Sequence, residues 1–418
     1  SQSKIGGLLG THFNKDGVAF DYGAHVPKQV GIPELDDILF GGLNESDWQW
    51  LDRLRVGSVF CGELYSRSQF VNLRSLPEDT YNRAVVELLT STEISPDDGI
   101  DALSYSLARY GKTITEKVLQ PVIERLFGCP MSELQARAIV LIGYSRFILF
   151  DHFFSSELKK SDFYDQIVGF PSWDEGLNPL LSIYPSKEGI HQWIDHLADE
   201  FVANGGEVAC LKTVAEMEKE DGSIRRIILS DGRVLKVKRL IWAGGLKPLM
   251  DLAKISLPDG VVPPQFRGTA LVNLVFDRPF LSDLYYVYHH DSSAIGYRTT
   301  MFPNLRKGDG CEPPYSCTVE IMADEDVIGS AQLVEKVCSE LGQAGLIGSD
   351  HQLVSEEVSA KTHGFAIPTI SFEKSSNLLK ESCQGIANNL LLLGRGGGTA
   401  HFINEVLIEV WNKLRDLD

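Results

Sequence analysis

The sequence is poor in cysteine and has no long hydrophobic run. Seven cysteines are spread over 418 residues, their number is odd, and no CxxC pair occurs. This pattern argues against a disulfide framework or a zinc motif and favours reduced thiols in a cytoplasmic protein. No apolar run reaches the roughly 18 residues of a membrane span. The longest apolar tract, 138–150, contains Arg146 and predicts a buried helix instead.

Basic residues are scarce as well. The chain has 39 lysines and arginines against 57 acidic residues, which gives a net charge of −18. Such a charge repels nucleic acids and anionic membranes, so we expect neither as a partner and expect a small-molecule substrate. It does not exclude a local basic pocket for an anionic small molecule.

Motifs for metal binding and for hydrolysis are missing. His289 and His290 are adjacent, and adjacent side chains on a strand point to opposite faces, so they do not form a ligand pair. No Gly-x-Ser-x-Gly elbow occurs, which leaves a hydrolase unsupported. We therefore expect no metal site.

The periodicity of apolar residues indicates a mixture of helices and strands. Spacings of three to four residues predict helices, short apolar runs predict strands, and Asp231-Gly232 predicts the turn of a hairpin. The predicted helices are 103–126, 132–153, 190–201 and 402–414, and the predicted strands are 207–211, 224–229, 234–237, 240–243, 270–276, 318–322 and 390–393. This mixture is typical of an α/β protein with a second domain interleaved in sequence.

Two glycine-rich segments are candidates for ligand binding. Gly6-Gly7 carries no Cβ, so its backbone can approach a flat or anionic ligand, although an ordinary turn is the commoner explanation. Near the C-terminus, strand 390–393 leads into glycines 394 and 396–398 and then into a helix. Amide groups at a helix start bind anions, and Arg395 can pair with a phosphate, but a plain connecting loop explains the segment equally well.

The order of these segments resembles that of the superfamily of FAD-dependent amine oxidases, protoporphyrinogen oxidases and UDP-galactopyranose mutases. The resemblance implies an α/β, two-domain FAD-dependent oxidoreductase-like fold, in which a discontinuous flavin domain holds an inserted substrate domain. Six short segments spread over nearly the whole chain carry it, at 3–11, 17–25, 110–134, 184–190, 242–249 and 394–405. The implied FAD-binding domain comprises 1–60, 181–250 and 376–418, and the substrate domain comprises 61–180 and 251–375.

The resemblance also implies that FAD is the cofactor. Gly6, Gly7 and Leu8 would line the flavin or its pyrophosphate, and Gly394 and Arg395 its ribityl–phosphate side. His25 would lie beside the flavin, or else bond to the backbone of its own loop, and no catalytic residue can be named. The full set of implied cofactor-binding residues is Lys4, Gly6, Gly7, Leu8, Gly23, His25, Val214, Gly394, Arg395 and Glu405.

The sequence departs from the pattern of this superfamily at three places. The GxGxxG unit is absent, and we favour a fragment of a longer chain over a protein that has lost this unit, because strands 240–243 and 390–393 are apolar enough to expect neighbours. Glu188 stands where a glycine is usual. Ala400 and His401 stand where the mutases carry an arginine and a tyrosine, which argues against a nucleotide-sugar substrate.

The expected function is that of a cytoplasmic FAD-dependent oxidoreductase, which takes a hydride from a small or medium organic substrate. One alternative is a flavin-dependent nucleotide-sugar mutase, with Arg298, Arg306 and Arg395 as the donors to the diphosphate. The other is a non-catalytic relative without flavin that acts as a partner subunit. The sequence does not determine the substrate, the electron acceptor or the oligomeric state.

Overall fold

The structure is a computed structural model of the 418-residue chain. It describes residues 4–415 except 94, 96–98, 177–178, 308–311, 398–399 and 401. Gly398 and His401, which the sequence singled out, lie outside the described residues.

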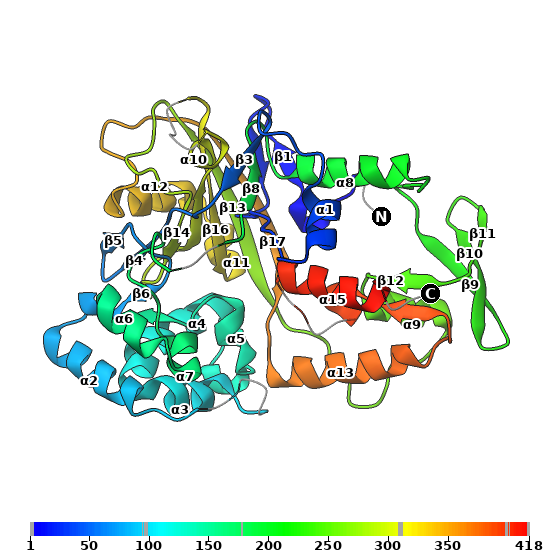
Figure 1. Ribbon diagram of the computed structural model, residues 1–418, viewed down its shortest axis with the longest axis horizontal. Coiled ribbons are helices and arrows are strands. Elements are labelled where there is room, and N and C mark those ends of the chain that lie inside the picture. The colour runs from blue at the N-terminus through cyan, green and yellow to red at the C-terminus, as the bar shows by residue number, and fades with distance from the viewer. Residues whose placement is uncertain are drawn as a thin grey trace.

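A seven-stranded mixed sheet runs through the centre of the molecule (Figure 1). Its neighbouring strands are antiparallel, except that β14 and β4 run parallel. In order across the sheet, the strands are β17 (Leu353–Ala366), β13 (Phe266–Phe276), β16 (Tyr315–Ala323), β15 (Gly296–Met301), β14 (Tyr286–His289), β4 (Val56–Phe60) and β5 (Glu63–Tyr65). The predicted strands 270–276 and 318–322 are confirmed.

The register gives this sheet two chemically different faces. Alternate residues such as Val272, Val319 and Val287 form an apolar face that packs on α12 (Leu333–Gln343) and α11 (Glu325–Ile328). On the opposite face, Leu271 pairs with Glu320, Glu320 with Arg298, and Arg298 with Tyr288. Because cross-strand partners share a face, these four side chains form a row across four strands, and three of them are polar or aromatic.

A cluster of short helices lies beside one end of the sheet, at the lower left of Figure 1. Its core is continuous with the sheet through Met322 and Ile367. The cluster contains η2 (Leu73–Ser75), α2 (Glu78–Leu89), α3 (Ala102–Ile114), a π-helical turn (Thr115–Leu119), α4 (Gln120–Phe127), η4 (Met131–Glu133), α5 (Arg137–Leu141), α6 (His152–Leu158), α7 (Asp162–Ile167) and the strand pair β6 (Val71–Asn72) and β7 (Phe147–Ile148).

One helix prediction is confirmed in this cluster and one is wrong. The helical spacing of 103–126 corresponds to α3, the π-helical turn and α4, which end at left-handed Gly128, although a kink at Gly111, with a φ of 83°, interrupts α3. The predicted helix 132–153 is instead a short α5, a left-handed Gly143 and strand β7. Phe147 and Ile148 are fully buried and pair with β6, so tertiary contacts override the helical pattern.

A third group of elements packs on the other side of the cavity described below. It surrounds Phe20, Phe40 and Trp193, and the rings of Phe40 and Trp193 stack at 5.9 Å. Its elements are η1 (Gly7–Leu9), β1 (Thr11–Phe13), β2 (Ala19–Asp21), α1 (Pro33–Phe40), β3 (Trp48–Leu51), β8 (Ser182–Pro185), α8 (His191–Ala203), α10 (Phe302–Lys307) and α15 (Ile403–Arg415). The predicted helices 190–201 and 402–414 correspond to α8 and α15.

The remaining elements form a separate core around Ile224, Leu249 and Cys383. Strands β12 and β18 form a parallel pair, and β9, β10 and β11 form a sheet in which the predicted hairpin is confirmed. The predicted strand 207–211 does not form. The bounds are β9 (Val214–Glu220), β10 (Ser223–Leu229), β11 (Val234–Lys236), β12 (Leu240–Trp242), α9 (Leu246–Ala253), α13 (Ile370–Gln384), β18 (Leu390–Leu392) and α14 (Gly394–Gly397).

The fold is therefore of mixed α/β class, as predicted. None of the helices in the described part of the chain has the length and apolar character of a membrane span.

Candidate functional site

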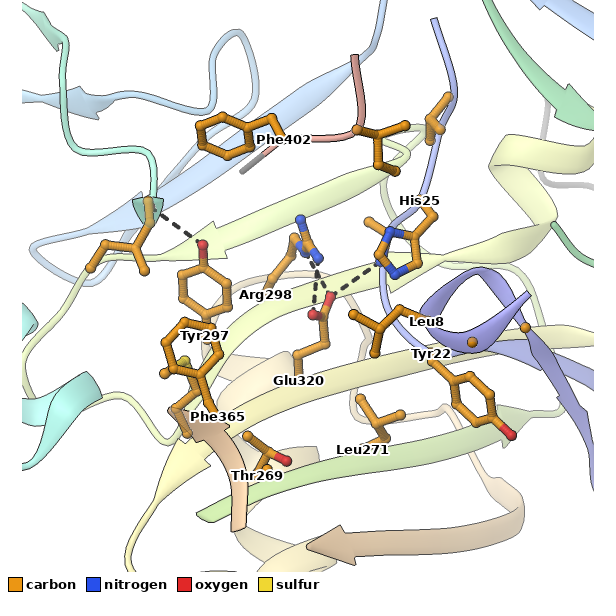
Figure 2. A pocket seen from close by; sticks show the side chains of 18 of the residues that line it. Leu8, Tyr22, His25, Thr269, Leu271, Tyr297, Arg298, Glu320, Phe365 and Phe402 are labelled. Carbon is orange, nitrogen blue, oxygen red and sulfur yellow. Dashed lines mark hydrogen bonds and ion pairs between the residues drawn. The ribbon is translucent and has the colours of Figure 1, made fainter. Parts of the chain in front are cut away.

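A cavity of about 1570 Å³ lies against the polar face of the seven-stranded sheet (Figure 2). Single small-molecule sites usually measure about 300–1,000 Å³, so this cavity has room for two molecules side by side. Its walls come from the N-terminal segment 4–26, the loop after α5, the sheet, and the segment around α14 and the start of α15.

Half of the cofactor-binding residues predicted from the sequence line this cavity: Lys4, Gly7, Leu8, His25 and Arg395. The others take different places. Gly6 precedes Gly7 in the same turn, Glu405 accepts a hydrogen bond from the Phe402 amide at 3.2 Å, and Val214 is half-buried in β9. Gly23 and Gly394 shape the backbone nearby. The structure places Val208 and Cys210, which precede β9, at the cavity wall.

The Gly6-Gly7 turn presents backbone to the cavity. Both residues have positive φ, at 107° and 57°, which glycine adopts without steric cost. A Cβ added at Gly7 would meet nothing within 4 Å, so the protein leaves this backbone uncovered. Lys4 and Arg395 add positive charge to the same cavity. An accessible glycine backbone in a cavity that also carries these two cationic side chains fits the diphosphate of a dinucleotide cofactor.

Gly394 turns the chain out of β18 and into the cavity wall. Its φ is 69°, and a Cβ there would lie 3.5 Å from the Cβ of Ala243 at the end of β12. Arg395 follows directly, in α14. The predicted strand–glycine–helix unit thus places one cation at the cavity.

An ion pair forms the centre of the sheet wall. The Arg298 Nε and Nη2 atoms lie 2.6 and 2.9 Å from the two carboxylate oxygens of Glu320, and Nη1 lies 3.2 Å from the Tyr288 hydroxyl. The guanidinium also lies 5.5 to 5.9 Å from the ring centres of Tyr286, Tyr288 and Tyr297. Figure 2 shows the two charged groups pointing toward each other in the middle of the cavity wall.

Glu320 also ties the N-terminal segment to the sheet. Its Oε1 atom accepts a hydrogen bond from the Ala24 amide at 3.3 Å. A Cβ on Gly23 would lie 2.9 Å from Oε2, and the φ of Gly23 is 116°, so glycine is required at this close approach. This contact holds the segment that carries His25 against the cavity.

His25 is a neutral side chain at this wall. Burial, together with the positive charges of Arg298 and Arg395, lowers its pKa to about 4, although Glu320 and a hydrogen bond to the Tyr22 backbone oppose the shift. At neutral pH the imidazole therefore carries no charge. His25 lines the cavity and bonds to the backbone of its own loop, whereas its position beside a flavin stays a prediction.

Sequence reasoning missed most of the residues that line the sheet side of the cavity. They are Ile142, Tyr297, Met322, Phe365 and, above all, Glu320. The available signal was a charge at an alternate position within the apolar strands 315–323 and 296–301. A charged residue in a buried strand needs a partner of opposite charge, and Glu320 and Arg298 form such a pair.

Arg298 and Arg306, two of the arginines predicted to bind a diphosphate substrate, have well-defined protein partners. Arg298 is held by Glu320. Arg306 lies outside the cavity lining and donates from Nε to the Glu188 carbonyl at 2.6 Å and from Nη2 to the Ala19 carbonyl at 2.8 Å. Glu188, which replaces a glycine of the motif, adopts a left-handed φ of 44°.

The adjacent histidines 289 and 290 are structural. His289 contacts Thr299 Oγ1 at 2.8 Å and Glu340 at 3.2 Å, while His290 contacts the Tyr144 hydroxyl at 2.7 Å and the Gln69 carbonyl at 2.9 Å. Burial lowers their pKa values to about 3 and about 4. Across the described residues, no group of three or more His, Cys, Asp and Glu side chains is arranged to hold a metal ion.

No protein-family model and no curated protein matches the sequence. Solved structures do match. Reduced UDP-galactopyranose mutase aligns with a TM-score of 0.72 and 15% identity, over 97% of this chain and 84% of that one. A putative protoporphyrinogen oxidase from Exiguobacterium sp. 255-15 aligns with a TM-score of 0.64 and 14% identity, over 100% and 91%. A CLA-producing fatty acid isomerase from P. acnes aligns with a TM-score of 0.52 and 14% identity, over the same shares of the two chains.

These similarities establish the fold. The chain has the fold that these solved structures share, and this is the fold that the resemblance implied. Identities of this size do not identify an activity.

Proposed function

We propose that this protein is an FAD-dependent oxidoreductase that acts on a small or medium organic molecule. The observation that supports this proposal is the cavity, which joins a cationic, glycine-lined end to an apolar and aromatic end. The fold supports it too, because the matching structures include a reduced UDP-galactopyranose mutase and a putative protoporphyrinogen oxidase.

The cationic end would hold the cofactor. Lys4 and Arg395 would pair with the diphosphate, and the backbone at Gly6, Gly7 and Leu8 would lie against it. FAD, when bound, supplies the acceptor for a hydride from the substrate. His25, being neutral, would offer a hydrogen bond there without adding positive charge.

The apolar end would hold the substrate. Ile142, Met322 and Phe365 exclude water from it, and the Tyr297 hydroxyl donates to the Ile142 carbonyl at 3.3 Å, which fixes the loop after α5 against the sheet. A substrate in this space would be oriented by packing against these side chains.

The deciding experiment is an absorption spectrum of the protein purified from its natural full-length reading frame, recorded before and after denaturation. A visible flavin band that is released on denaturation is the expected result. No band, even after soaking with FAD, would contradict the proposal and favour a non-catalytic relative that acts as a partner subunit.

A pair of arginine variants tests the cofactor end. Arg395→Leu should weaken FAD binding about tenfold or more, because a hydrogen bond to a charged group contributes about 1.5–3 kcal/mol. Arg226→Leu is the matched control, since Arg226 pairs with Glu218 on the exposed face of β10 and does not line the cavity. FAD titration followed by fluorescence measures both, and equal affinities would remove Arg395 from the cofactor site.

A further inference from the structure

The charge of the cavity is opposite to that of the protein. Acidic residues outnumber basic ones by 57 to 39 in the whole chain. Among the described residues that line the cavity, basic side chains outnumber acidic ones by five to two: Lys4, Arg146, Arg298, Lys361 and Arg395 against Asp195 and Glu320. A basic cavity in an acidic protein attracts anions.

Three of the five cations are already assigned. Glu320 neutralises Arg298 through two short hydrogen bonds. Lys4 and Arg395 lie at the glycine-lined end, where the proposed cofactor has its own two negative charges. Arg146 and Lys361 remain, one on the loop after α5 and the other on the edge strand β17.

Arg146 keeps donors available at the cavity wall. Its Nε donates to the Asp165 carbonyl at 2.9 Å, and its Nη2 lies 3.8 Å from the Asp165 carboxylate. That carboxylate is closer to Lys159, at 2.5 Å, so it compensates Arg146 only weakly. The Arg146 side chain is 38% exposed, and a guanidinium has five N–H groups to offer.

Lys361 lies on the same face of the sheet as the apolar end of the cavity. It pairs across strands with Thr269, which in turn pairs with Met322. Its side chain is exposed, and within the described part of the chain no carboxylate lies within 4.0 Å of its ammonium group. A cation thus borders the surface formed by Met322 and Phe365.

We propose that the substrate is an amphiphilic carboxylate. Its apolar or aromatic body would pack on Ile142, Met322 and Phe365, and its carboxylate would bind Arg146 and Lys361. This inference rests on the proposed function, because it assigns the other cations of the cavity to the cofactor.

The other substrate classes fit this end less well. An ammonium group would need an acidic partner, but Glu320 is held by Arg298, and Asp195 belongs to α8 on the opposite wall. A nucleotide sugar has two phosphates and a polar sugar, whereas the walls here are aliphatic and aromatic.

Calorimetric titration of the FAD-loaded protein with three probes tests the proposal. We expect 4-phenylbutyrate to bind at least tenfold more tightly than 4-phenylbutylamine and more tightly than UDP. No binding of the carboxylate, or tighter binding of the amine or of UDP, would overturn the inference. The same preparations report on the cofactor, since a protein without flavin refutes the proposed function whatever the titration shows.

Three variants test whether Arg146 and Lys361 bind the carboxylate of the probe. Arg146→Met and Lys361→Met should each weaken 4-phenylbutyrate about tenfold and leave the FAD content unchanged, whereas Arg226→Met, far from the cavity, should change neither. Lys361 is exposed on an edge strand, so Lys361→Met is expected to fold. It therefore still tests the proposal if Arg146→Met does not fold. Unchanged carboxylate affinity in both cavity variants would refute the assignment.

Discussion

Glu320 is the residue on which the site depends most. It pairs with Arg298, accepts the Ala24 amide and touches the backbone of Gly23, so one carboxylate connects two strands and the N-terminal segment. Both partners of the ion pair are largely buried, with side chains 17% and 16% exposed. Removing one partner of such a pair leaves the other charge buried and uncompensated.

Glu320→Ala should therefore lower the free energy of unfolding by roughly 3 kcal/mol. The double variant Glu320→Leu with Arg298→Met should recover part of this loss, because it removes both charges. Urea denaturation measures the free energy of unfolding of the natural protein and of each variant. The control is Glu218→Ala, whose pair with Arg226 is exposed and should contribute less than about 1 kcal/mol. Equal losses at Glu320 and Glu218 would contradict this role.

At the scale of elements, the junction between β8 and α8 shows how closely the parts are packed. A Cβ at Gly189 would lie 2.2 Å from Asp21 Oδ1 and 2.5 Å from Thr11 Oγ1. Asp21 is buried and accepts hydrogen bonds from Thr11, Tyr184 and Ile190. Its carboxylate therefore cannot move aside without losing partners.

Two glycine variants test this packing. Gly189→Ala should destabilise the protein by about 1–3 kcal/mol through overpacking. Gly342→Ala is the matched control, because a Cβ in the last turn of α12 would meet nothing within 4 Å. It should leave the stability unchanged or raise it by up to about 0.5 kcal/mol, since glycine is a poor helix former. Thermal unfolding distinguishes the two, and a tolerated Gly189→Ala would show that the junction is loose.

Patterns of neighbouring residues predicted most helices and strands. They failed where an element forms through pairing with a segment far away in the sequence. Helices α3, α4, α8 and α15 follow the apolar periodicity, and the hairpin of β10 and β11 follows from Asp231-Gly232. The segment 132–153 shows the limit. Its apolar residues suit a helix or a strand equally, and pairing of Phe147 with Val71 decides for the strand.

At the scale of the whole molecule, buried histidines make stability depend on pH. His290 has a folded pKa of about 4 against an ordinary value of 6.5, and His289 one of about 3. At pH values between the ordinary pKa of 6.5 and these lowered folded-state pKa values, the histidines bind protons only in the unfolded chain. Stability from these groups is therefore complete above about pH 6.5 and is lost as the pH falls toward 4.

His290 alone should account for a loss on the order of 3 kcal/mol between pH 7 and pH 4. Urea denaturation at several pH values measures the slope. His290→Gln should flatten the slope even if it lowers stability overall, whereas His363→Gln, on an exposed stretch of β17, should leave it unchanged. An unaltered slope in His290→Gln would refute this explanation.

The order of short segments along the chain carried the resemblance that implied the fold class, and five of the residues that the resemblance assigned to the cofactor line the cavity: Lys4, Gly7, Leu8, His25 and Arg395. Turns and helix periods are local properties, so they can be read from neighbouring residues. The pairing of Glu320 with Arg298 and the position of Lys361 across from Thr269, which pairs with Met322, depend on strand register. Register is set by contacts between residues far apart in the chain, and only the folded structure brings those residues together.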